Sequence, residues 1–531
     1  MLDYILEQTE IYLQNMDKEK RKKIGQFFTS KETAKFMAGI LETKKEHLKI
    51  LDPGAGSGIL SATLISKLQN TNVKSIDLTL YENDNNILPL LHKNIEYMTK
   101  TSSIIINYSI IEKNYILDNK DDFNSTLLAH KDLCKYDFII CNPPYLKISK
   151  DAPEAKAMPL VCYGAPNMYF LFMSMALFEL KENSQMVFII PRSWTSGAYF
   201  KKFREYLLLE ARIKHIHLFV SRNKVFEKEK VLQETIIVHI VKTKEKLDLI
   251  EISSTESNFD FKDINSFMVP YNLAVSEDEN KFVYLPINKE EVEILNKINK
   301  FKYTLQEIGI RLKTGLTVSF RNRGLLHDKA DKENVPLIYS THFKNGTIEF
   351  PIQTDKKQYI DNLKKGLVQK NKDYLFIKRF TSKEEKRRIQ PAIYLKNICN
   401  KYDYISTDNK INFIDTIDKN EILTKDEIYG LYIVFNSTLY GKYYRILNGS
   451  TQVNATEINY MHVPNRKQLK EIGKRIQDIN DLSVKTCDEI LEELLDGEVR
   501  RCKRDIEIIR NAKSSAIWFV RVYIISYGSN H

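Results

Sequence analysis

Residues 50–60 read ILDPGAGSGIL, and this stretch decides the fold that we expect. An apolar strand ends at Asp52, a glycine-rich turn follows, and a helix begins near residue 59. Gly54, Gly56 and Gly58 let the backbone bend sharply and approach a ligand closely, because a Cβ atom would intrude there. Asp52 can accept hydrogen bonds or face a cation. Taken alone, the turn suits a dinucleotide, a phosphate group or S-adenosylmethionine equally well.

The chain around this turn alternates short apolar runs with helical segments from about residue 48 to 240. The apolar runs are LKILDPG, SIDLTLYE, KYDFIICNPPY, SQMVFIIP and QETIIVHIV. This alternation predicts βαβ units and a mainly parallel sheet, which is an α/β, Rossmann-like fold. The second run ends with Glu82, where an acidic residue can bind both ribose hydroxyls of an adenosine. The chain has no GxxxxGK[ST] motif, which disfavours a nucleoside triphosphatase.

Asn142, Pro143, Pro144 and Tyr145 directly follow the apolar run YDFIIC. Two prolines after a strand restrict the backbone and remove two N–H donors, so that carbonyl groups point into a cleft. An adenine amino group is a weak nucleophile because its lone pair is delocalised into the ring. The amide oxygen of Asn142 and the carbonyl of Pro143 can accept its two protons, which frees the lone pair to attack a sulfonium methyl. We expect Tyr145 to stack on the base.

In this order the motifs resemble those of the γ-class of DNA adenine-N6 methyltransferases, over about residues 20–240. The resemblance implies a Rossmann-like, S-adenosylmethionine-dependent methyltransferase domain followed by an α+β target-recognition domain. It also implies that Thr29 contacts the methionine end of the cofactor. Asp52, Gly54 and Gly56 would enclose the cofactor, and Glu82 would hold its ribose.

Two further roles follow from the same resemblance. The family reads the cofactor's adenine with an Asp followed by an apolar or aromatic residue, and Asn114-Tyr115 is the best match in this chain. An Asn can still accept a hydrogen bond from an adenine amino group. Phe226 matches the aromatic that packs against a flipped-out base, and base flipping is required because adenine N6 is paired inside the duplex.

The C-terminal half resembles the recognition region of modification methyltransferases of the PstI/BsuBI type, which leads us to expect CTGCAG as the target. The segments that carry this resemblance are RLKTGLTVSFRNR, DYLFIKRFTSKEEKRR and NGSTQVNATEI. Arginine can bind phosphate or make paired contacts with guanine. The candidate DNA-binding residues are Arg321, Arg323, Lys378, Arg379, Arg387 and Arg388.

The change of pattern along the chain predicts four regions. We expect a catalytic domain at 1–245, a bridging segment at 246–300, a target-recognition domain at 301–464 and a helical segment at 465–531. The length of 531 residues is too great for one compact core.

Composition restricts the classes of protein further. The net charge of +11 permits a polyanionic partner, and six cysteines without ligand spacing argue against a metal site. The chain contains no apolar run of 18 residues and begins without a signal peptide, so we expect a cytoplasmic bacterial protein with no membrane span. We expect a monomer that acts on double-stranded DNA, with any cognate restriction endonuclease as a separate protein.

Several alternatives stay open at this point. The NPPY chemistry also serves methyltransferases that act on adenine in RNA, on a protein glutamine or, less readily, on cytosine N4. About 230 residues after the catalytic part argue against a compact glutamine methyltransferase. A DNA-binding subunit without catalytic activity would have no need of Asp52, Glu82, Asn142 and Tyr145 together.

Overall fold

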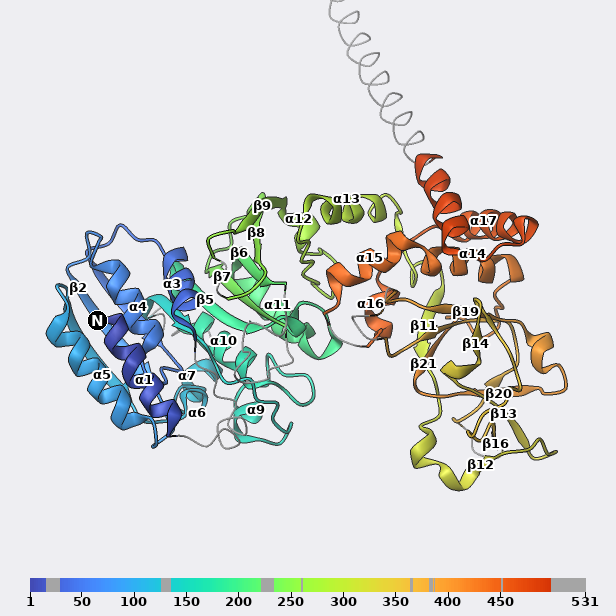
Figure 1. The fold of residues 1–531 in the computed structure, drawn as a ribbon, viewed down its shortest axis with the longest axis horizontal. Coiled ribbons are helices and arrows are strands. Elements are labelled where there is room, and N and C mark those ends of the chain that lie inside the picture. Colours follow the sequence, from blue (N-terminus) through green and yellow to red (C-terminus); the bar gives the residue numbers. More distant parts are fainter. Residues whose placement is uncertain are drawn as a thin grey trace, which may run out of the picture. The chain divides into compact units, whose positions relative to one another are not determined.

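A computed structural model describes residues 1–15, 29–125, 135–220, 234–258, 261–362, 366–381, 385, 387–449 and 452–497. These residues form two compact units, both visible in Figure 1. The first unit comprises Met1–Val292 and Ile446–Gly449. The second comprises Glu293–Arg445 and the described residues 452–497.

A nine-stranded sheet forms the centre of the first unit, in the order β3-β2-β1-β4-β5-β7-β6-β8-β9. Strands β3, β2, β1, β4 and β5 pair in parallel, and β7 runs antiparallel to both β5 and β6. The predicted α/β, Rossmann-like class is therefore confirmed. The strands are β1 (His47–Asp52), β2 (Ser75–Tyr81), β3 (Ile105–Ile111), β4 (Tyr136–Cys141), β5 (Leu180–Pro191), β6 (Arg212–Phe219), β7 (Thr235–Val241), β8 (Leu249–Thr255) and β9 (Asn265–Pro270).

Helices cover both faces of this sheet, and the described residues form a hydrophobic core on each face. One core includes residues of α1 (Leu2–Gln14), α3 (Lys31–Ile40), α4 (Ile59–Leu68) and α5 (Leu88–Thr101). The other includes α6 (Tyr115–Asp118), α7 (Lys120–Asn124), α9 (Pro153–Ala157), α10 (Met168–Glu179), α11 (Lys201–Glu210) and α12 (Tyr271–Ala274). Every residue of α10 is buried, which explains why its sequence is apolar on all sides.

The sheet extends beyond residue 245, where we expected the catalytic domain to end. Strand β8 pairs in parallel with β6, and β9 pairs antiparallel with β8. Residues 246–292 therefore belong structurally to the first unit, because backbone pairing joins them to its sheet. The division into four functional regions stays a prediction.

The second unit is α+β, and its described residues form three small sheets and several helices. Its larger sheets have the strand orders β11-β21-β18-β19-β15-β14 and β12-β16-β13-β20-β17, and β10 pairs with β22. Its strands are β10 (Tyr303–Thr304), β11 (Ile310–Thr314), β12 (Leu326–His327), β13 (Asn334–Ile338), β14 (Phe343–Lys344), β15 (Thr347–Ile348), β16 (Tyr359–Asp361), β17 (Gln369–Lys370), β18 (Tyr374–Lys378), β19 (Pro391–Tyr394), β20 (Tyr404–Thr407), β21 (Ile411–Thr416) and β22 (His462–Val463). The helices α13 (Lys289–Ile298) and α15 (Thr438–Leu447) cross the boundaries of the units, and α14 (Lys425–Asn436), α16 (Ala455–Asn459) and α17 (Arg466–Ile479) lie within the second.

Two glycines allow α14 and α17 to pack with their backbones in contact. A Cβ atom on Gly430 would lie 2.1 Å from the carbonyl oxygen of Leu469, and one on Gly473 would lie 1.8 Å from that of Asp426. Neither helix can carry a larger residue at these points without moving away from the other. Residues 484–497 are also helical, as the periodicity of the C-terminal region predicts, and the remainder of that region lies outside the described residues.

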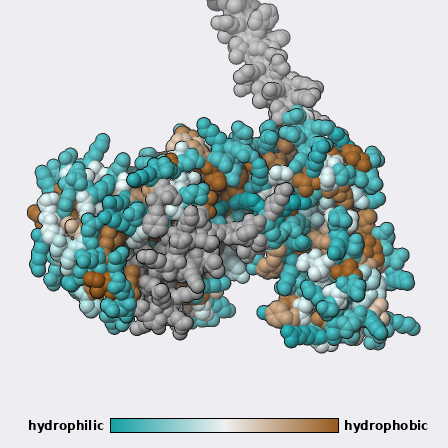
Figure 2. Space-filling view, viewed as in Figure 1, coloured by the Kyte–Doolittle hydropathy of each residue, from teal (hydrophilic) through white to brown (hydrophobic). Residues whose placement is uncertain are grey.

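The surface of the described residues is mainly hydrophilic on the face that Figure 2 shows, with apolar residues in small separate patches. Most large apolar side chains are instead used in the cores of the two units. Across the described ranges, the helices are too short or too polar to cross a membrane.

Glu179, at the end of α10, is a buried carboxyl group in the core of the first unit. The hydroxyl of Tyr115 donates to its Oε2 at 2.6 Å, and Lys135 Nζ lies 3.8 Å from its Oε1. Burial disfavours the charged form and raises the pKa of Glu179 to about 7. Between its ordinary pKa and this value, the unfolded chain has lost the proton that the folded chain keeps. The free energy of unfolding therefore falls as the pH rises through this window.

We predict that Glu179→Gln weakens this pH dependence, because an amide carries no proton to lose. Glu179 contributes at most about 1.4 kcal/mol per pH unit to the fall in stability. Urea unfolding of the wild type and the variant at pH 5 and pH 7 measures the difference. Asp52 has a similarly raised pKa, so part of the slope is expected to remain. Equal slopes in the two proteins would mean that Glu179 is already ionised at pH 5.

Candidate functional site

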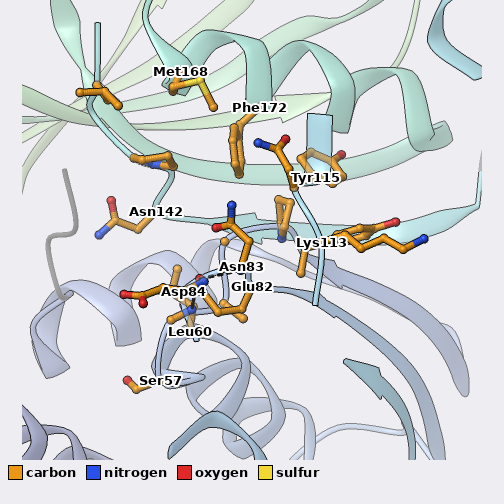
Figure 3. Close-up of a pocket in the computed structure, with 18 of the residues that line it drawn as sticks. Ser57, Leu60, Glu82, Asn83, Asp84, Lys113, Tyr115, Asn142, Met168 and Phe172 are labelled. Carbon is orange, nitrogen blue, oxygen red and sulfur yellow. Dashed lines mark hydrogen bonds between the residues drawn. The ribbon is translucent and has the colours of Figure 1, made fainter. Parts of the chain in front are cut away.

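A cavity of about 520 Å³ opens at the carboxyl ends of β1, β2 and β4 in the first unit (Figure 3). The order of the sheet reverses between β1 and β4, and ligands of open α/β sheets bind at such a reversal. The volume suits a nucleoside-sized molecule. Its lining includes Thr29, Pro53, Gly54, Gly56, Ser57, Leu60, Glu82, Asn83, Asp84, Asn114, Tyr115, Asn142, Pro144, Glu154, Met168 and Phe172.

The glycine-rich turn forms one wall of this cavity. Gly56 and Gly58 have φ values of 54° and 85°, a region that residues with a Cβ rarely adopt. Asp52 lies beneath the turn rather than in the wall, since it is fully buried and accepts a hydrogen bond from the Ser61 hydroxyl at 2.8 Å. Burial raises the pKa of Asp52 to about 7. Asp52 therefore braces the start of α4 from below.

Glu82 follows β2 and points its carboxylate at the turn. Its Oε2 accepts the Gly56 N–H at 2.9 Å, and its Oε1 accepts the N–H groups of Asn83 at 2.8 Å and Asp84 at 2.9 Å. Burial raises the pKa of Glu82, and these backbone donors oppose the shift by stabilising the anion. A carboxylate has about four acceptor positions, so this one retains the capacity to bind a further hydroxyl.

Asn142 directly follows β4 and lies across the cavity from Glu82 (Figure 3). Its Nδ2 donates to the hydroxyl oxygen of Thr29 at 3.1 Å. Thr29 is 7% exposed and precedes α3, so a residue 113 positions away in the sequence orients this amide. The contact directs the amide oxygen of Asn142 away from Thr29.

Asn114 and Tyr115 both line the cavity, but the side chain of Asn114 is already engaged. Its Oδ1 accepts the N–H groups of Ile116 at 3.1 Å and Leu117 at 3.2 Å, which caps α6. Its Nδ2 donates to Glu154 Oε1 at 2.9 Å. The ring of Tyr115 is buried and packs against Phe172, with ring centroids 5.3 Å apart. An acceptor role for the Asn114 side chain therefore competes with its role as a helix cap.

The sequence did not single out several residues that line the cavity. Met168 and Phe172 are four positions apart on α10, and Phe172 points into the cavity opposite Asn83 (Figure 3). Because α10 is apolar on every side, its sequence carries no periodic signal for the face that lines a site. Glu154 comes from α9, ten residues after Pro144 of the cavity wall, and no motif marks it.

Comparison with known proteins relates most of the chain to one family. A family model described as Eco57I restriction-modification methylase matches residues 14–226. The type II methyltransferase M.PstI of Providencia stuartii is 34% identical over 490 residues, which cover 90% of this chain and 94% of that protein. M.BsuBI of Bacillus subtilis is 35% identical over 486 residues, with the same coverage of each chain. This chain belongs to the type II methyltransferases of restriction–modification systems.

The resemblance to PstI/BsuBI-type enzymes that the motifs suggested is thereby confirmed. Among solved structures, the type IIG restriction endonuclease BpuSI aligns with 89% of this methyltransferase and 66% of its own chain, at 14% identity and a TM-score of 0.42. That similarity is too low to support any inference about function.

Pro143, Tyr145 and Phe226 were further candidates for catalysis in this methyltransferase. Pro143 is buried and is not among the residues that line the cavity. The Tyr145 hydroxyl donates to the carbonyl oxygen of Ile189 at 2.9 Å, and its ring is half-buried against the two cores of the first unit. Phe226 lies outside the described residues, so its role stays a prediction.

Within the described ranges, His, Cys, Asp and Glu side chains form no group of three that could hold a metal ion.

The candidate DNA-binding residues of the second unit differ in how far they are exposed. Arg321 and Arg323 are exposed, and the Arg321 guanidinium lies 5.5 Å from the ring of Phe320, which is itself 65% exposed. Lys378 and Arg379 are partly buried, and Arg379 Nη1 donates to the carbonyl oxygen of Asn409 at 3.1 Å. Arg321 and Arg323 are therefore the most accessible cations of the predicted set.

Arg387 and Arg388 are held by the protein itself. Arg387 Nη2 donates to the carbonyl oxygen of Asn436 at 2.8 Å, beside a cavity of about 410 Å³ that Lys378 also lines. Arg388 is 1% exposed, donates to the carbonyl oxygen of Thr381 at 2.5 Å and lies 5.9 Å from the ring of Tyr444. The prediction that Arg388 contacts DNA is therefore not supported by its position, because its guanidinium is enclosed in the second unit.

We predict that Arg388→Ala destabilises the second unit by about 2–4 kcal/mol, because it removes buried contacts and leaves a carbonyl group unpaired. Arg323→Ala is the matched control, since Arg323 is exposed and its loss should change stability by less than about 0.5 kcal/mol. Chemical denaturation of both variants measures the difference. Equal small effects would mean that Arg388 is free to leave its buried position.

Proposed function

We propose that this chain transfers the methyl group of S-adenosylmethionine to N6 of an adenine flipped out of double-stranded DNA, as the modification enzyme of a type II restriction–modification system. The observation that carries the proposal is that Glu82 and Asn142 line one cavity of a chain in the type II methyltransferase family. The family relationship supports DNA as the substrate. The PstI/BsuBI-type resemblance leads us to expect CTGCAG as the target.

The residues of the cavity fit S-adenosylmethionine. The Glu82 carboxylate would bind a ribose hydroxyl at its remaining acceptor position, and the turn at Gly54 and Gly56 would approach the methionine part closely, with Asp52 supporting the turn from below. Phe172 provides an apolar surface for a purine ring. Thr29 lines the cavity near Asn142 and would lie at the methionine end. When bound, S-adenosylmethionine supplies a methyl group that its sulfonium makes electrophilic.

The role of Asn142 follows from its orientation. Its amide nitrogen donates to Thr29, so the amide oxygen would be the atom that accepts a proton of the substrate amino group. The carbonyl of Pro143 would accept the second proton. Accepting both protons localises the nitrogen lone pair, so that the amine can attack without a strong base. Thr29 orients Asn142 before any substrate binds, which would lower the cost of reorganisation in the transition state.

The target base must leave the duplex to reach this cavity, because adenine N6 is paired within the double helix. Tyr145 and Phe226 are the aromatic residues that we expect to contact the flipped base. Arg321, Arg323, Lys378, Arg379 and Arg387 are the proposed DNA contacts of the second unit, with phosphate contacts that orient the duplex and base contacts that select the sequence.

We predict complete N6-methyladenine at one short motif when the chain is expressed in a methylation-free host, with long-read sequencing as the measurement.

Asn142→Ala should reduce transfer about 10²–10³-fold or more, because one preorganised acceptor is lost. The variant should still bind S-adenosylhomocysteine and duplex DNA like the wild type. Loss of both kinds of binding would give Asn142 a structural role instead.

Other products in the same experiment would indicate a different activity. N4-methylcytosine at a motif would identify a cytosine methyltransferase. Unmodified DNA, with a protein that binds S-adenosylhomocysteine, would favour an RNA or protein substrate. A chain that binds duplex DNA but not the cofactor would be a non-catalytic subunit.

We predict that Arg321→Ala weakens binding to duplex DNA and lowers the slope of log Kd against log salt concentration by about 1, because one phosphate contact is lost. Fluorescence anisotropy at several salt concentrations measures both effects. Lys44→Ala is the control, since Lys44 is exposed and precedes β1, at the sheet edge opposite the cavity. An unchanged slope for Arg321→Ala would remove this residue from the DNA-binding surface.

A further inference from the structure

The strand order of the sheet determines which end of the cavity receives the purine of the cofactor. Along the carboxyl edge, the sequence of strands is β3, β2, β1, β4. Asn142 follows β4, so the methyl group must lie near the end of β4 to reach the substrate nitrogen that Asn142 would bind. Glu82 follows β2, where the ribose is proposed to bind. A purine attached to that ribose then extends past β2, towards the residues that follow β3. This step rests on the proposed use of S-adenosylmethionine.

The polar side chains that follow β3 in the cavity wall offer no unused hydrogen-bond acceptor for the amino group of the purine. Lys113 and Asn114 are the polar residues that line the cavity here; Lys113 has no side-chain acceptor, and the Oδ1 of Asn114 accepts two backbone N–H groups of α6. A carbonyl oxygen has two lone pairs, so these two donors use its capacity. The side-chain donors of Asn114 are on Nδ2, and a purine amino group does not accept from them. Asn114 is therefore poorly suited to bind an adenine amino group directly.

Glu154 lies at the same end of the cavity and supplies an acceptor. It lines the cavity from α9, which packs against α6, and it is partly buried. Its Oε1 accepts from Asn114 Nδ2 at 2.9 Å, and within the described part of the chain this is the one hydrogen bond that its carboxylate makes. Its second oxygen thus retains both acceptor positions.

We propose that Glu154 accepts a hydrogen bond from the exocyclic amino group of the cofactor's adenine, and that Asn114 positions Glu154 for this contact. Asn114 then joins two elements: its oxygen fixes the start of α6, and its nitrogen holds the carboxylate that α9 contributes. Phe172, whose ring contacts Tyr115 beside this end of the cavity, packs against the purine face and leaves its edge to Glu154. Glu154 is in this way a specificity-determining residue for adenine.

The test is the preference of the purified full chain for S-adenosylhomocysteine over S-inosylhomocysteine, measured by calorimetric titration. The inosyl compound carries an oxygen in place of the amino group, and a carboxylate repels that oxygen. We expect the wild type to prefer the adenosyl compound by about 10–100-fold, the value of one hydrogen bond to a charged group. Glu154→Gln should reduce this preference at least about tenfold, because its amide can donate to the inosyl oxygen.

Asp84→Asn is the matched control, because it removes one negative charge from the same cavity without changing the proposed acceptor. It should keep the wild-type preference for the adenosyl compound even if both affinities change. A Glu154→Gln protein that binds both compounds more weakly but keeps the wild-type preference would overturn the proposal and leave Glu154 a structural role. A wild type that does not bind S-adenosylhomocysteine would instead overturn the proposed function itself. Thermal unfolding of each variant checks that the first unit remains folded.

Discussion

The parallel pairing of β1 with both β2 and β4 is the constraint on which the rest of the site depends. Asp52 is paired in register with Leu80 of β2, and Leu51 with Ile139 of β4, so all three strands end at the same edge. Glu82 and Asn142 are 60 positions apart in the sequence, yet this register brings both to one cavity. The glycine turn after β1 keeps the space between them open, because side chains there would fill it.

The polar groups of the first unit divide into two kinds according to their burial. Asp52 and Glu179 are fully enclosed, and burial raises the pKa of each to about 7. Asp52 accepts a hydrogen bond from Ser61 and Glu179 accepts one from Tyr115, and neither carboxyl group is among the residues that line the cavity. Glu82, Asn142 and Glu154 line the cavity, where each has a neighbour that sets its orientation. Such preset acceptors suit chemistry that requires no strong base.

The motif residues could be predicted because their neighbours in sequence also define their local structure. Asp52, Gly56, Glu82 and Asn142 each follow an apolar strand, and the end of a parallel strand has one place in an open α/β sheet. Arg388 could not be assigned in this way. Its sequence context is basic and polar, like that of its neighbours, and its burial beside Thr381 and Tyr444 appears only in the tertiary structure.

The sequence by itself determined the fold class, the order of the motifs and the residue types at the ends of β1, β2 and β4, because periodicity and turn chemistry are local properties. Only the tertiary structure decided which side chains from distant segments contact the motif residues. Thr29 orients Asn142, and Glu154 meets Asn114, through contacts between segments 113 and 40 positions apart. The extension of the sheet through β8 and β9 also depends on pairing between distant strands. Local patterns carry no information about such contacts, because these depend on how whole helices and strands pack.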